Sequence, residues 1–281
     1  MMNTTPYNAP LPASPLMEEE MLVAYEALHW LMEIGVDVAV EEDPQKGSRL
    51  NVQHPEEQEI SVKPLNAEPS SLNASIIEAR IAADAANTLE ELYTAIRAFN
   101  GCTLKKTAQN TVIFEGVAQS RLMFIGEAPG ADEDRQGVPF CGASGQLLDK
   151  ALSFIGLNRK ENFYITNTLF WRPPGNRTPT TEELEICKPF VEKHIALIKP
   201  HTLVLVGGTA TKAILNNNIG ITRLRGQIFS YKNSYMDSEV PVHVIYHPSY
   251  LLRQPSAKKQ AWADILQLKQ HLITIGHKLS A

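Results

Sequence analysis

The sequence has few cysteines and no long apolar run. Three cysteines among 281 residues argue against a disulfide framework. No apolar stretch is long enough to cross a bilayer, and residues 1–20 lack a basic start followed by an apolar segment. These absences predict a soluble, cytoplasmic protein with no membrane partner.

The chain also lacks the excess of basic residues that is typical of proteins that bind nucleic acid, since its formal net charge is -5. The charge is unevenly divided, however. Residues 1–97 hold 17 acidic and 5 basic side chains, whereas residues 98–281 hold 14 acidic and 21 basic side chains. A basic body behind an acidic leader favours a polyanionic partner for the body alone.

The acidic residues 1–97 are predicted to form an extension that precedes the main domain. Residues 1–16 are rich in Pro, Asn, Thr and Ala and are expected to be disordered. Thr88 and Glu91 have the spacing of a capping box, which predicts the start of a helix. Short helices are expected at residues 17–34, 75–83 and from 89 onward. We therefore expect a partly disordered extension with short helices, followed by a folded domain at residues 98–281.

Four buried apolar runs alternate with helical patterns in this second part. The apolar runs lie at residues 121–125, 163–166, 202–206 and 242–246. The helical patterns lie at residues 144–155, 181–198, 208–215 and 259–274. Strands that alternate with helices predict a parallel sheet with helices on both faces. The expected fold is therefore a three-layer α/β/α sandwich around a four-stranded parallel sheet, with the strand ends gathered on one rim.

Three polar motifs follow the first, second and fourth of these strands. They are GEAPGADEDRQGVPFCG from Gly126, TNTLFWRPPGNR from Thr166 and HPSYLLR from His247. All three are expected to meet at the carboxyl edge of the sheet, where ligands bind in such folds. The first motif is neither a Walker loop nor a dinucleotide fingerprint, and its acidic side chains would repel phosphates. A neutral base and a developing positive charge suit it better.

Together these motifs resemble those of the uracil-DNA glycosylase superfamily, in the version carried by its type-4 branch. The resemblance covers residues from about 98 to the end of the chain. It implies a monofunctional enzyme that flips uracil out of single- or double-stranded DNA and hydrolyses the bond to deoxyribose, leaving an abasic site. No lysine in the motifs offers a Schiff-base nucleophile, so strand cleavage is not expected. A monomer is expected.

The resemblance also implies roles for individual residues. Glu127 and His247 are the expected catalytic residues, the first facing positive charge on the sugar and the second donating to uracil O2. Phe140 is expected to stack on the base, Asn167 to bind its amide edge, and Glu133 to exclude the methyl group of thymine. The remaining expected contacts are Gly126 and Ala128 for uracil, and Pro129, Gly130, Arg177, Ser249, Leu251, Leu252 and Arg253 for DNA. Either leucine could wedge into the base stack.

The resemblance fails at two positions that concern a cofactor. Type-4 relatives usually carry an iron–sulfur cluster on four cysteines. Cys102 and Cys187 match two of these ligands, but Lys105 and Trp171 stand at the other two. Four thiolates are the normal requirement of such a cluster, so we expect no cluster, no other cofactor and no metal.

Two other functions stay open on the sequence alone. Loss of the cluster ligands is also compatible with a non-catalytic module that binds uracil or DNA. The second alternative is a glycosylase for another deaminated base, such as hypoxanthine or xanthine. The residue that orients the attacking water is open as well, because Ala128 stands where other branches have an aspartate.

Overall fold

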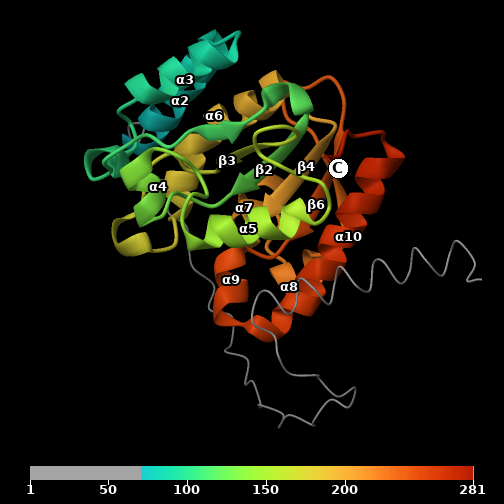
Figure 1. Cartoon of the computed structure of the whole chain (residues 1–281). Helices are drawn as coiled ribbons and strands as arrows, with labels where there is room; N and C mark the ends of the chain where they lie inside the picture. Colours follow the sequence, from blue (N-terminus) through green and yellow to red (C-terminus); the bar gives the residue numbers. More distant parts are fainter. Residues whose placement is uncertain (1–70, 281) are drawn as a thin grey trace, which may run out of the picture.

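The structure, a computed structural model, describes residues 71–280 (Figure 1). The helix predicted at residues 17–34 and the disorder predicted at residues 1–16 lie outside this range. Within the described range, no helix combines the length and the apolar character needed to cross a membrane.

Six strands form one mixed sheet in the order β1-β3-β2-β4-β6-β5. Their bounds are β1 Phe114–Gly116, β2 Leu122–Gly126, β3 Tyr164–Asn167, β4 Thr202–Val206, β5 Ile228–Tyr231 and β6 Val240–Ile245. The four inner strands are parallel, which confirms the predicted sheet. The antiparallel edge strands β1 and β5 were not predicted. Strand β1 has three residues and β5 is largely exposed, so neither forms a buried apolar run.

Helices cover both faces of this sheet. Their bounds are α2 Ser71–Ala85, α3 Leu89–Ala98, α4 Ala131–Gln136, α5 Ala143–Ser153, α6 Thr181–Ile198, α7 Gly208–Leu215, α8 Ile221–Leu224, α9 Pro248–Arg253 and α10 Lys258–Thr274. Alternate residues of β2 enter two different cores: Met123 packs with α2, α3, α6 and α7, whereas Phe124 packs with α5 and α10. The three-layer α/β/α arrangement is therefore confirmed.

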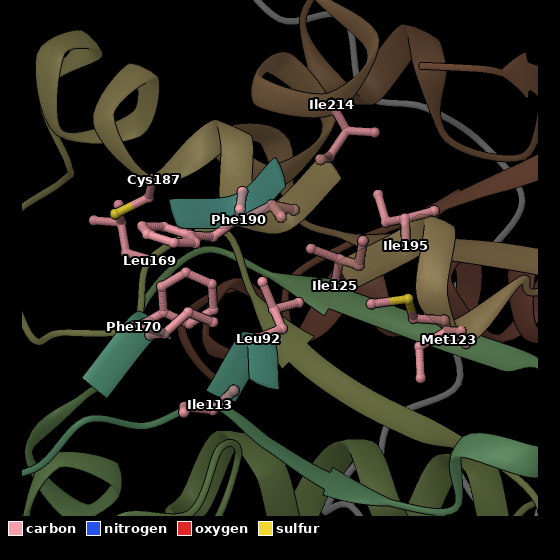
Figure 2. Packing of buried hydrophobic residues seen from close by; sticks show 14 of the residues in the cluster. Leu92, Ile113, Met123, Ile125, Leu169, Phe170, Cys187, Phe190, Ile195 and Ile214 are labelled. Atoms are coloured by element: carbon pink, nitrogen blue, oxygen red, sulfur yellow. The ribbon is translucent and has the colours of Figure 1, made fainter. Parts of the chain in front are cut away.

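The first of these two cores includes the helices that precede the sheet. Figure 2 shows Leu92 of α3 among residues of β2 and α6. Thr88 begins α3 with the predicted capping box, because its side chain accepts the Glu91 N–H and the Glu91 carboxylate accepts the Thr88 N–H. Both α2 and α3 pack on α6. They share a core with the body of the protein, while the domain boundary between residues 97 and 98 stays a prediction.

Residues that follow α10 fold back onto the loop between α5 and β3. The Ser280 N–H donates to the carbonyl of Gly156 at 2.8 Å. The Asn162 amide donates to the carbonyl oxygens of Gly156 at 2.8 Å and Lys278 at 3.2 Å. The chain segment after α10 therefore fixes a loop that also carries Arg159.

Candidate active site

The three motifs meet at the carboxyl edge of the parallel strands, as expected. Gly126 ends β2, Asn167 ends β3 and His247 follows β6. A cavity of about 640 Å³ opens at this edge. Its lining includes the predicted site residues Glu127, Ala128, Pro129, Gly130, Glu133, Phe140, Asn167, Arg177, His247, Ser249 and Arg253. The structure thus brings together residues that are more than one hundred positions apart in the sequence.

Gly126 allows an aromatic ring and an amide to approach each other at one end of the cavity. A Cβ atom at position 126 would overlap the ring edge of Phe140 and would lie 2.5 Å from Asn167 Oδ1. Phe140 is 6% exposed and Asn167 is 2% exposed. Asn167 Oδ1 has no hydrogen-bond partner among the described residues. Because a buried acceptor without a partner is costly, this oxygen is suited to receive an N–H from a ligand.

His247 lies beside this ring and presents a neutral imidazole. The ring centroids of Phe140 and His247 are 5.8 Å apart. The Ser249 N–H donates to Nδ1 of His247 at 3.2 Å, so Nδ1 is an acceptor and the proton of the neutral ring sits on Nε2. Burial, with a smaller contribution from Arg253, lowers the pKa of His247 to about 4. The site therefore holds an uncharged N–H donor at neutral pH.

Glu133 connects the two loops that shape the cavity. Its Oε2 accepts the Gly130 N–H at 3.0 Å, and its Oε1 accepts the Gly142 N–H at 2.9 Å. Both carboxylate oxygens are thereby occupied by the backbone. The role of this side chain in excluding thymine stays a prediction, to which the structure adds that the carboxylate is fixed in place.

The backbone of Glu127 is also fixed, next to the strand that carries the amide. The Glu127 carbonyl accepts the Leu169 N–H at 3.1 Å and the Thr168 hydroxyl at 2.6 Å. These bonds join the loop after β2 to the end of β3. Glu127 thus lines the cavity on a backbone that is fixed to the end of β3.

The residues expected to contact DNA occupy different environments. Leu252 is 48% exposed, whereas Leu251 is 5% exposed and packs with Tyr246. Only Leu252 therefore presents an exposed side chain, and its role as a wedge stays a prediction. Arg177 lines the cavity but forms a bidentate ion pair with Glu183, with distances of 2.6 and 2.9 Å. Its guanidinium is therefore already bound to a carboxylate in the protein without DNA.

Several residues of the site were missed by sequence reasoning. Ile221, Thr222 and Tyr246 line the cavity, and so does Tyr250, which lies within the third motif. Ile221 and Thr222 belong to α8, a four-residue helix outside the three motifs. Nothing in the local sequence pattern signals their position at the cavity, because the approach of α8 depends on tertiary packing.

A family model described as the Uracil DNA glycosylase superfamily matches residues 113–266. This range includes the three motifs, the four parallel strands and the whole lining of the cavity. The fold is thus that of a known superfamily of uracil-DNA glycosylases, and the match spans the residues that line the cavity.

Comparison with curated proteins narrows this assignment. The type-4 uracil-DNA glycosylase of Archaeoglobus fulgidus is 36% identical over 185 residues, which cover 64% of this chain and 92% of the relative. Those of Sulfurisphaera tokodaii and Pyrobaculum aerophilum are 35% and 36% identical, over 67% and 63% of this chain and 86% and 91% of each relative. The chain belongs to the uracil-DNA glycosylase superfamily and, within it, to the type-4 family.

The type-4 family is known for an iron–sulfur cluster, and the residues at the corresponding place in this protein do not fit one. Lys105 Nζ donates to the carbonyl oxygens of Arg97 and Phe99 at the end of α3. Trp171 is fully buried, and its indole N–H donates to the Thr111 hydroxyl at 3.0 Å. Two of the four expected thiolates are thus replaced by side chains that are already engaged.

The two matching cysteines, Cys102 and Cys187, are buried free thiols. A hydrogen bond from Cys187 lowers the pKa of Cys102, and the same bond together with burial raises the pKa of Cys187. No group of three or more His, Cys, Asp or Glu side chains suited to a metal ion occurs among residues 71–280.

Proposed function

We propose that the protein is a monofunctional glycosylase that excises uracil from DNA in base excision repair and leaves an abasic site. The observation that carries this proposal is the meeting of Phe140 and Asn167 over Gly126, with a neutral imidazole from His247 beside them. A flat ring, a buried amide and a donor are the groups needed to hold a flipped uracil and receive its developing negative charge.

Asn167 is proposed to select uracil over cytosine. Its unpartnered Oδ1 accepts the N3–H of uracil, and its Nδ2 donates to O4. Cytosine offers an acceptor at N3 and a donor at C4, so it opposes the fixed amide at both positions. Phe140 stacks on the base, and Gly126 and Ala128 line its edge. Thymine is excluded in this proposal by Glu133, which the backbone holds at the cavity wall.

The reaction breaks the bond between N1 of uracil and C1′ of the sugar. The electron pair of that bond leaves with uracil, and the Nε2–H of His247 donates to O2 as the negative charge grows. Positive charge develops on the sugar and is stabilised by Glu127. A water molecule adds its hydroxyl to C1′, and the proton that it releases neutralises the uracil anion, so the products are uracil and an abasic deoxyribose. No metal takes part in these steps.

The DNA strand is proposed to lie across the mouth of the cavity. In this proposal the backbone of the flipped nucleotide is contacted by four residues that line the cavity, namely Pro129, Gly130, Ser249 and Arg253. Arg177 lines the same rim, and its guanidinium is shared between Glu183 and the DNA in this proposal. Leu252 fills the space that the flipped base vacates.

Several features of the whole protein belong to the same proposal. The enzyme works without an iron–sulfur cluster, as a cytoplasmic monomer, on single- or double-stranded DNA. Residues 98–281 form the catalytic domain, and the acidic extension at residues 1–97 takes no part in the chemistry.

The test is incubation of the purified protein with an oligonucleotide that contains one uracil, followed by alkali. Cleavage at the uracil position after alkali, and not before it, is the expected result. Matched oligonucleotides with thymine, cytosine, hypoxanthine or xanthine at that position should stay intact. Cleavage of the hypoxanthine or xanthine strand alone identifies the other glycosylase, and binding without cleavage identifies a non-catalytic module.

A further inference from the structure

Phe140 has a backbone conformation that a residue with a side chain rarely adopts. Its φ angle is +52°, in the left-handed region. Such a conformation is unfavourable in a non-glycine residue and persists only where the surroundings impose it. The first turn of α5 is part of those surroundings, because a Cβ atom at Gly145 would overlap the carbonyl group of Phe140.

Arg159 binds the backbone at this strained position. Its Nη2 donates to the Phe140 carbonyl at 3.0 Å, and its Nη1 donates to the Pro139 carbonyl at 3.1 Å. The guanidinium therefore holds two consecutive carbonyl groups with one rigid plane. Arg159 lies outside the three motifs, in the loop between α5 and β3.

Two carboxylates fix Arg159 from the other side. Asp149 of α5 accepts from Nε at 3.1 Å and from Nη2 at 2.7 and 2.8 Å. Glu115 of the edge strand β1 accepts from Nη1. These bonds account for all five guanidinium N–H groups of Arg159, whose side chain is only 11% exposed. Because all of its N–H groups have acceptors and it is mostly buried, the Arg159 side chain is held in a single conformation.

We propose that Arg159 is a positioning residue for the base-stacking ring, acting through the backbone of Phe140 and not through contact with DNA. The proposal rests on the proposed function, because it assumes that Phe140 stacks on uracil. Through Arg159, the hydrogen bonds to Glu115 of β1 and Asp149 of α5 fix the backbone of Phe140 and thereby the orientation of its ring. Loss of the guanidinium lets residues 139 and 140 relax toward an ordinary conformation, which turns the ring away from Gly126.

The chemistry of the side chain predicts that lysine cannot replace it. The planar fork of arginine reaches two carbonyls and two carboxylates at once, whereas an ammonium is a compact group with three donors. Arg159→Lys keeps the charge balance with Asp149 and Glu115, and so it should retain most of the stability. It should still lose the simultaneous hydrogen bonds to the carbonyl oxygens of Pro139 and Phe140.

The test is a double-mutant cycle on the full-length protein, with Arg159→Met, Arg159→Lys, Phe140→Ala and the combination of Arg159→Met with Phe140→Ala. Single-turnover excision and affinity for uracil-containing DNA are measured well below the lowest melting temperature of the set. Each arginine variant alone should lose about 10- to 100-fold in rate with nearly unchanged affinity. In the Phe140→Ala background the same change should cost almost nothing further, because residues that act through one another are not additive.

Arg80→Met is the matched control for the loss of an ion-paired arginine, since Arg80 binds Glu192 and lies on α2, away from the cavity. It should leave the rate unchanged. Wild-type rates for Arg159→Met and Arg159→Lys, or equal losses with and without Phe140, overturn the proposal.

A second measurement separates this proposal from the proposed function. Hydrogen exchange of the segment at residues 137–145 needs no activity, and Arg159→Met should speed exchange there but Arg80→Met should not. A wild-type protein without excision activity refutes the proposed function, whereas unchanged exchange in Arg159→Met refutes the hold on Phe140. Should Arg159→Met fail to fold, Arg159→Lys supplies both readouts.

Discussion

The Ser249 N–H donates to Nδ1 of His247, and this backbone hydrogen bond determines which nitrogen of the imidazole can act as a donor. Since Nδ1 is occupied as an acceptor, the ring proton is on Nε2. Ser249 Oγ lies 2.8 Å from the same Nδ1 and adds a second contact. The sequence motif His-Pro-Ser thus contains both the donor and the groups that orient it.

His247→Ala should lower the single-turnover rate of uracil excision by about two to three orders of magnitude, because it removes one donor to the departing base. Affinity for uracil-containing DNA should change little. A purely structural role predicts instead a lower melting temperature and parallel losses of binding and rate. Ser249→Ala is the matched control: it retains the backbone N–H and should cost about 2- to 10-fold. A folded His247→Ala protein with normal turnover removes this histidine from the mechanism.

Asn167→Asp should weaken discrimination between uracil and cytosine. The carboxylate loses the donor to O4, and an unmade bond of this kind costs about 1–3 kcal/mol, or about 5- to 150-fold in rate. Excision kinetics on uracil and cytosine strands measure the effect. Asn233→Asp provides the control, because that amide donates to the Glu192 carbonyl near β5, away from the cavity. Unchanged uracil kinetics in Asn167→Asp mean that the amide does not bind the base.

Removing residues 1–70 should leave excision intact and strengthen DNA binding, because the removed segment is strongly acidic. Affinity should fall steeply with salt in both forms. The position of the cut matters: Leu72 and Ile76 of α2 pack against the core. A cut after residue 75 therefore removes the first turn of α2 and should lower the melting temperature. Loss of DNA binding in a folded protein that starts at residue 71 places part of the DNA site in the extension.

The parts of this protein that repeat a simple pattern could be predicted from its sequence. The four inner strands are almost wholly buried and appear in the sequence as largely apolar runs. Thr88 and Glu91 mark the start of α3. The edge strand β1 carries no such pattern, because three half-buried residues do not form a run. Its membership in the sheet depends on pairing with β3.

The site shows the same division. Residues within the three motifs were identified through their resemblance to the motifs of the superfamily, and the structure brings most of them to one cavity. Arg159 was not identified, because a lone arginine in a polar loop looks like any solvated charge. Its proposed role depends on Asp149 and Glu115, which come from two other elements. Leu251 and Leu252 could not be separated by sequence, because only packing decides which of two neighbours is exposed.

Purified protein should be colourless and should contain no stoichiometric iron or sulfide, even after anaerobic purification. The reason is the engagement of Lys105 and Trp171, which leaves two thiolates where a cluster normally takes four. Iron and sulfide analysis and the visible spectrum are the measurements. Treatment with a chelator should also leave the melting temperature unchanged. Iron and sulfide near four per chain contradict the prediction.

Stability should decrease as the pH falls from about 6.5 to about 4. Burial lowers the pKa of His194 to about 3 and the pKa values of His243 and His247 to about 4. In that window these histidines bind protons in the unfolded chain but stay neutral in the native protein. The free energy of unfolding is therefore highest above pH 6.5 and declines as the pH falls toward 4. Melting temperatures between pH 8 and pH 4 measure this. His243→Leu should show a shallower decline, since Nε2 of His243 has no partner among the described residues; identical slopes contradict the assignment.

The contact between residues 277–280 and the loop around Asn162 has a consequence for synthesis. The ribosome makes Lys278 116 residues after Asn162. At about 5–20 residues per second, the loop waits roughly 6 to 23 seconds for this partner. Arg159 lies in that loop and is proposed to position Phe140, so under this proposal the ring of Phe140 reaches its final position only after residues 277–280 have been made.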